Sequence, residues 1–120
     1  MVAIQIFSET DADVVARLLS QICGYEISVG RLHELPSTTN RASFVLGTDT
    51  RVKQTTYTDY KPRSHIAMDV YNYGHTEQAP IGNDLKLKIR QLWEQLERPV
   101  AFHTADICSE RDNPLSIDDL

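Results

Sequence analysis

The histidines have the widest chemical repertoire in this 120-residue chain, because imidazole can act as a base, bind a metal or hydrogen-bond near neutral pH. They are His33, His65, His75 and His103, and the shortest gap between two of them is ten residues. A zinc site requires several ligands and commonly includes a close pair on a helix or turn. We therefore expect no metal site, and the sequence indicates no other cofactor.

His65 and Asp69 could in principle act as a base and the carboxylate that orients it. They are four positions apart in a predicted strand, so their side chains share a face but lie about 13 Å apart at roughly 3.3 Å per residue. The chain also contains no nucleophile elbow, P-loop or dinucleotide-binding glycine motif. The sequence leaves enzymatic activity uncertain and favours a protein that binds rather than catalyses.

One face of the predicted sheet, which we expect the helices to leave open, concentrates aromatic and titratable side chains around Gln5. Aromatic residues are enriched in ligand pockets and in protein interfaces, but tyrosines are also common on ordinary solvated strands. All three interpretations stay open. The candidate ligand or interface residues are Phe7, His65, Asp69, Tyr71, Tyr73 and His103.

A second candidate surface is the stretch from residue 41 to residue 63, which holds five basic and two acidic side chains. Tyr57 and Tyr60 are interleaved with the basic residues, and this combination can hold single-stranded nucleic acid by charge and stacking. The net charge of −5 disfavours nucleic acid as the partner, and the acidic residues after Thr104 are an alternative partner. The basic residues are Arg41, Arg51, Lys53, Lys61 and Arg63.

Hydrophobic periodicity predicts two helices, at 11–23 before Gly24 and from 83 to about 98 before Pro99. Ser8 or Thr10 is expected to cap the first helix and Asn83 the second. Alternation predicts strands at 2–7, 25–35 with a bulge at Gly30, 42–46, 64–73 and 100–104, whereas 48–60 could form an edge strand or a hairpin arm.

This order predicts an α+β protein with a ferredoxin-like (split βαβ) sandwich, in which a mainly antiparallel sheet carries two helices on one face. The alternative is another α+β arrangement with a long hairpin inserted at 42–73. We expect a single domain at 1–104 and an acidic, flexible tail at 105–120. The strand residues expected beneath the helices are Ile4, Ile6, Ile27, Val29, Ile66, Met68, Val70, Val100 and Phe102.

The composition, 41% hydrophobic and 24% charged, suits a globular domain, and no apolar run approaches the length of a membrane span. The first residues lack the basic and long apolar regions of a signal peptide. Cys23 and Cys108 belong to no metal-binding or redox spacing. We therefore expect two free thiols in a reducing cytoplasm, with Cys23 as a small buried hydrophobic residue.

The aromatic face, together with the lack of catalytic motifs, predicts a small soluble interaction domain of the regulator, adaptor or inhibitor type. It is expected to self-associate as a homodimer through the open sheet face, and it could also bind another protein. The alternative is a small-molecule-binding protein, or a small enzyme, that uses the His, Tyr and Asp residues of the same face. Association with a membrane is not expected.

Overall fold

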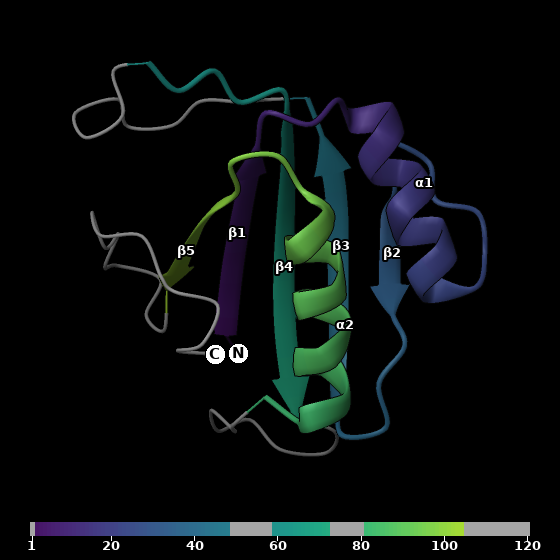
Figure 1. The fold of residues 1–120 in the computed structure, drawn as a ribbon. Coiled ribbons are helices and arrows are strands. Elements are labelled where there is room, and N and C mark those ends of the chain that lie inside the picture. The colour runs from purple at the N-terminus through teal and green to yellow at the C-terminus, as the bar shows by residue number, and fades with distance from the viewer. Residues whose placement is uncertain (1, 49–58, 73–80, 105–120) are drawn as a thin grey trace.

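The structure, a computed structural model, describes residues 2–48, 59–72 and 81–104. Within these residues the chain forms an α+β fold with one open, five-stranded antiparallel sheet and two helices (Figure 1). The elements follow the order β1 (Val2–Ser8), α1 (Ala12–Cys23), β2 (Leu32–Leu35), β3 (Asn40–Gly47), β4 (Ser64–Asn72), α2 (Asn83–Gln95) and β5 (Val100–Thr104). The predicted α+β class and mainly antiparallel sheet are confirmed.

The strands lie in the order β2-β3-β4-β1-β5, and each neighbouring pair is antiparallel. β4 lies between β1 and β3, and β1 lies between β4 and β5, so each helix links strands that are not neighbours (Figure 1). The helices contribute to one core with the same side of the sheet, which confirms that both lie on one face. A ferredoxin-like topology is not confirmed, because β2 adds a fifth strand at the edge beyond β3.

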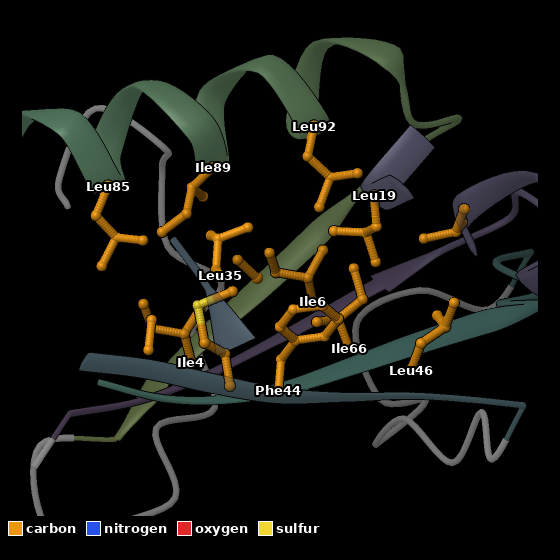
Figure 2. Close-up of a cluster of buried hydrophobic side chains, with 14 of the residues drawn as sticks. Ile4, Ile6, Leu19, Leu35, Phe44, Leu46, Ile66, Leu85, Ile89 and Leu92 are labelled. Atoms are coloured by element: carbon orange, nitrogen blue, oxygen red, sulfur yellow. The ribbon is translucent and has the colours of Figure 1, made fainter. Parts of the chain in front are cut away.

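The core fills the space between the helices and one face of the sheet (Figure 2). Phe44 lies at its centre with an exposed fraction of 0%, beneath Leu19 of α1 and Ile89 of α2. Full burial of a large apolar side chain stabilises a fold by about 1.5–3 kcal/mol. The strand residues that the sequence places correctly in this core are Ile4, Ile6, Ile66, Met68 and Val70.

The side chains of β5 are assigned to the wrong faces by the sequence. Ala101 belongs to the core under the helices, whereas Val100 and Phe102 contact Phe7 on the other side of the sheet. The register explains this, because Ala101 pairs with Ile6 and Val100 pairs with Phe7, and paired residues share a face. Alternation separates two faces but does not show which one a five-residue strand buries.

The first helix forms where the sequence predicts it. Val15 and Leu19 are buried on its apolar side, and Gly24 ends the helix in the left-handed conformation (φ 80°), where its N–H donates to the Ser20 carbonyl at 2.9 Å. The predicted caps are wrong, because the N-cap is Asp11 rather than Ser8 or Thr10.

The predicted strand at 25–35 is wrong over its first seven residues, since β2 contains only Leu32–Leu35. Gly30 has a φ of 84°, which turns the chain rather than forming a bulge within a strand. Ile27 still reaches the core, but it does so from a loop, where its N–H donates to Ser20 Oγ at 3.0 Å. Val29 lies outside the core and is exposed.

The second helix buries Leu85, Ile89 and Leu92 and ends at Gln95, three residues before the predicted end. Its N-cap is Gly82, so Asn83 begins the helix instead of capping it. β4 extends to Asn72, and Tyr73, the last residue of the predicted strand, lies outside the described residues. Most of the segment 48–60 and all of the predicted tail at 105–120 lie outside the described residues.

A polar clamp joins the turn between β2 and β3 to the start of α2. The Asp84 carboxylate accepts hydrogen bonds from Thr38 N at 2.7 Å, Ser37 Oγ at 3.1 Å and Thr38 Oγ1 at 3.1 Å. The backbone N–H of Thr38 makes the largest contribution to lowering the pKa of Asp84, from 3.8 to about 2. Nearby, buried Asn40 accepts a hydrogen bond from Gly82 N at 2.7 Å. The carboxylate form of Asp84 therefore holds the turn against the helix.

Candidate functional site

The open face is the side of the sheet opposite the helices. The register arranges its residues in rows across the strands, and most of the central side chains are small. Successive rows contain Phe7 with His65, Gln5 with Val45 and Ala67, Ala3 with Ser43 and Asp69, and Arg41 with Tyr71. Gln5 is exposed, and Ala3, Ser43, Val45 and Ala67 are half-buried. We call the four small, half-buried side chains Ala3, Ser43, Val45 and Ala67 the flat centre of the open face.

An aromatic cluster lies at one end of the open face. The His65 ring is stacked on Phe7, with centroids 4.3 Å apart and an interplanar angle of 6°. Phe102 meets Phe7 edge-on at 5.9 Å, and His65 Nε2 lies 3.2 Å from Gln5 Oε1. Gln5, Phe7 and His65 are therefore brought together as the sequence suggests, and Phe102 joins them unexpectedly.

Phe7 is not available as a contact residue on the surface of the described structure. Tyr60 and Val100 cover it, and its exposed fraction is 5%. Arg98 in turn lies over the Tyr60 ring, with its guanidinium carbon 5.6 Å from the ring centroid. Phe7 thus anchors a second, smaller core that closes this end of the open face.

The other candidate residues of this face are more dispersed. Asp69 is half-buried and paired with Ala3, two rows from His65, which agrees with the expectation that the two side chains are too far apart to form a dyad. Tyr71 is 39% exposed at the opposite end of β4. The backbone of His103 pairs with Ile4 of β1, and the side chain of His103 lies outside the described part of the structure. Tyr73 lies outside the described residues.

The described members of the predicted basic patch do not form one surface. Arg41 is the second residue of β3, and its Nε lies 2.9 Å from Glu34 Oε1. Arg63 directly precedes β4, and its Nη2 lies 2.6 Å from Asp11 Oδ1. Because Arg41 pairs with Tyr71, eight residues from Arg63 along β4, these two residues lie at opposite ends of the sheet, about 26 Å apart at roughly 3.3 Å per residue. Lys61 is exposed near Arg63, and Arg51 and Lys53 lie outside the described residues.

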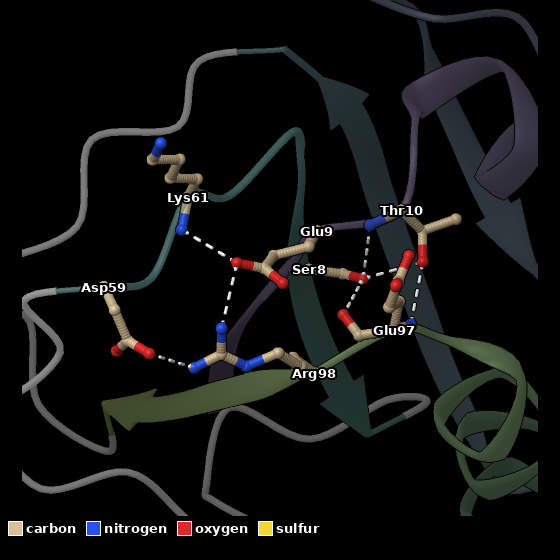
Figure 3. Close-up of polar contacts among 7 residues, drawn as sticks. All are labelled: Ser8, Glu9, Thr10, Asp59, Lys61, Glu97 and Arg98. Atoms are coloured by element: carbon tan, nitrogen blue, oxygen red, sulfur yellow. Dashed lines mark hydrogen bonds and ion pairs between the residues drawn. The ribbon is translucent and has the colours of Figure 1, made fainter.

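Sequence reasoning misses a polar cluster in which three connections meet at one end of the sheet (Figure 3). Ser8 Oγ donates to the Glu97 carbonyl at 2.9 Å, and Glu97 N donates to Thr10 Oγ1 at 2.8 Å. Glu9 Oε1 accepts from Arg98 Nη1 at 3.3 Å and from the backbone N–H of Lys61 at 3.0 Å. The hydroxyls expected to cap α1 are thus used to join it to the α2–β5 connection.

Arg98 holds this cluster together in a strained conformation. Its φ is 47°, a left-handed value that is uncommon for a residue with a side chain. The guanidinium also reaches Asp59, with 3.4 Å between Nη2 and Oδ2. The strain is offset by contacts to two carboxylates and to Tyr60, so the cluster has a structural role at the end of the sheet where the second core lies.

The titratable groups described by the structure show no arrangement typical of catalysis. Desolvation raises the pKa of the half-buried Cys23 thiol to about 11, which keeps it protonated at neutral pH. Across 2–48, 59–72 and 81–104, no group of His, Cys, Asp and Glu side chains is placed to hold a metal ion. Cys23 packs against the core as a small hydrophobic residue, but it is half-buried rather than buried as predicted.

A groove of about 830 Å³ runs beside the outer strand β2. Tyr25, Leu32 and Arg41 line it, together with Lys88 of α2, whose Nζ donates to the Pro36 carbonyl. The sequence does not single out this groove, because its walls come from a loop, two strands and a helix.

Comparisons of the chain with protein families, with curated proteins and with solved structures found no match. Neither helix in the described part of the chain has the length and apolar character needed to cross a membrane.

Proposed function

We propose that this protein is a small interaction domain that self-associates through its open face as a cytoplasmic homodimer. The observation that supports this most is the flat centre of the open face, formed by Ala3, Ser43, Val45 and Ala67. Two sheets can pack face to face at about 10 Å when the side chains between them are small enough to interdigitate.

The surroundings of this flat centre also suit an interface. Phe102 is half-buried at one end and Tyr71 is 39% exposed at the other, and aromatic residues are enriched where proteins meet. Because Gln5 and Asp69 add polar groups between them, the face combines apolar contact area with groups that can fix an orientation. Such a domain would act as a regulator, adaptor or inhibitor, either as the homodimer or with a protein partner.

A small-molecule site, or a small enzyme, on the same face is the second candidate. The observation that favours it is the half-buried imidazole of His65, which lies beside the Gln5 amide with Nε2 and Oε1 3.2 Å apart. Asp69 and Tyr71 would supply the remaining polar contacts. Because one face of the His65 ring is stacked on Phe7, a ligand would contact the edge of the imidazole ring rather than that face.

For the fold, we propose that β5, β1, β4 and β3 with the two helices form a ferredoxin-like unit to which β2 is added. Their order and alternating connections support this proposal. If β2 is disregarded, β1 and β4 are the central strands of the sheet, and β3 and β5 are its edges.

Analytical ultracentrifugation of Ala67→Arg tests the interaction proposal. Ala67 is half-buried at the centre of the open face, so an arginine there would place an unpaired charge in the interface. We expect a dimeric wild type and a monomeric Ala67→Arg variant. Leu87→Arg is the matched control, because Leu87 is 61% exposed on α2 and should leave the dimer intact. A monomeric wild type, or a dimeric Ala67→Arg variant, would contradict the proposal.

A further inference from the structure

One side chain covers the outer edge of β2, the edge that does not pair with β3. Tyr25 lies in the loop after α1, and its hydroxyl accepts a hydrogen bond from Glu34 N at 3.1 Å and donates one to the Glu34 carbonyl at 2.5 Å. An antiparallel neighbour would bind this residue through the same two backbone groups. Tyr25 therefore occupies a strand-pairing position.

A side chain of β2 also contacts the backbone of the loop after α1. Ser28 N donates to His33 Nε2 at 3.1 Å, and the His33 ring lies 5.9 Å from the Tyr25 ring. Gly30 N donates to the Leu46 carbonyl at 2.7 Å, which fixes the end of the loop to β3. Desolvation raises the pKa of Tyr25 above 10, so its hydroxyl keeps the proton that it donates to Glu34. The loop is thus held along the edge at several points.

The edge beneath this loop has properties that favour pairing with another strand. Leu32 is 71% exposed, and its backbone groups face the same way as those of Glu34, because alternate residues of a strand have the same orientation. The Glu34 carboxylate is held on β3 by Arg41, at 2.9 Å. Exposed apolar edge strands are the sites at which sheets associate unless something blocks them.

We propose that Tyr25 is a latch on the edge of β2, and that the unlatched edge pairs with β2 of a second copy of this chain. An antiparallel two-fold axis at His33 would place Leu32 opposite Glu34 of the partner subunit. Each such pair exchanges two hydrogen bonds, and a two-fold contact closes on itself as a dimer. This register also keeps the two Glu34 carboxylates from lying directly opposite each other, which would be unfavourable.

The latch concerns the sheet edge and does not depend on the open-face interface. The two are distinguished by their variants, because Ala67→Arg alters only the open face and Tyr25→Phe alters only the edge. Tyr25→Phe removes the hydroxyl while keeping the ring beside His33. Both edge variants are made in the Ala67→Arg background, so that the open-face contact cannot join edge-paired dimers into chains. There we expect Tyr25→Phe to double the mass at the same concentration.

Tyr25→Phe/Glu34→Pro is the matched control, because proline removes the outward N–H of Glu34 and leaves the bonds of His33 and Leu35 to β3 in place. We expect its mass to return to that of Ala67→Arg alone. Hydrogen exchange at the Glu34 amide gives a second measurement, with protection in the wild type and at least tenfold faster exchange in Tyr25→Phe diluted until it dissociates.

An unchanged mass for Tyr25→Phe, a doubled mass for the double variant, or open-ended polymers instead of a dimer would overturn the proposal. Far-ultraviolet circular dichroism confirms that each variant is folded, and equal Glu34 exchange in wild type and Tyr25→Phe would overturn the latch even if Tyr25→Phe is too unstable for sedimentation.

Discussion

The imidazole of His65 lies flat on the phenyl ring of Phe7, with 4.3 Å between centroids and 6° between planes. The two residues face each other across β4 and β1 in the register, so the sheet itself sets their separation. This pair joins the main fold to the second core, in which Tyr60 and Val100 cover Phe7. The stacking gives His65 a structural role beside any role in binding.

Replacing His65 separates these roles. We expect His65→Ala to lower the free energy of unfolding by about 1 kcal/mol, because the stacked pair is lost, whereas His65→Phe keeps the stack and most of the stability. Urea unfolding followed by Trp93 fluorescence measures both. Equal stability of His65→Ala and the wild type would show that the stack contributes nothing.

Phe44 should be among the residues most sensitive to truncation. It has an exposed fraction of 0% beneath both helices, so Phe44→Ala leaves a cavity and is expected to cost about 3–5 kcal/mol. Leu87→Ala, on the exposed side of α2, should change stability by less than about 0.5 kcal/mol. Chemical denaturation of the two variants measures this difference in stability. Similar decreases in the free energy of unfolding would contradict the central position of Phe44 in the core.

Asp84 should make stability depend on pH in the acid range. Its pKa is about 2 in the folded protein against an ordinary value of 3.8, so folding favours the carboxylate. The stabilisation is fully present above pH 3.8 and is lost as the pH falls toward 2. Asp84→Asn should therefore be less stable than the wild type near neutral pH, and the difference should narrow in acid. A constant difference across that range would contradict the clamp.

Cys23 should react slowly in the folded protein. With a pKa of about 11, almost none of the thiol is ionised at neutral pH. In a Cys108→Ser variant, we expect alkylation of Cys23 to be at least tenfold slower than in the same variant unfolded in urea. Comparable rates before and after unfolding would show that the thiol is neither buried nor shifted.

The fold is predictable from the sequence where local patterns determine it. Helical spacing finds α1 and α2, and alternation finds β1, β3, β4 and β5, because these elements bury one face each. The strand predicted over residues 25–31 is wrong. Tyr25, Ile27 and Val29 alternate as in a strand, but the turn at Gly30 places them in a loop. The buried face of β5 is predicted wrongly, because it depends on the register between β5 and β1, which is set only when the two strands pair in the folded protein.

The candidate site is predictable only in part, for the same physical reason. Gln5, Phe7 and His65 meet because neighbouring strands align them, but Tyr60 comes from a connection far from Phe7 in the sequence. The Ser8–Glu97 and Arg98–Glu9 contacts each join residues 89 positions apart. Composition shows that such polar residues exist but does not show which loops meet, so the cluster at this end of the sheet is found only in the structure.

Isotope-filtered nuclear Overhauser spectroscopy on a mixture of labelled and unlabelled protein tests the open-face interface most directly. We predict intermolecular contacts from the methyl groups of Ala3, Val45 and Ala67, since these side chains form the flat centre of that face. Intermolecular contacts from the methyl groups of Leu87 instead, or none from the open face at concentrations at which the protein is dimeric, would contradict it.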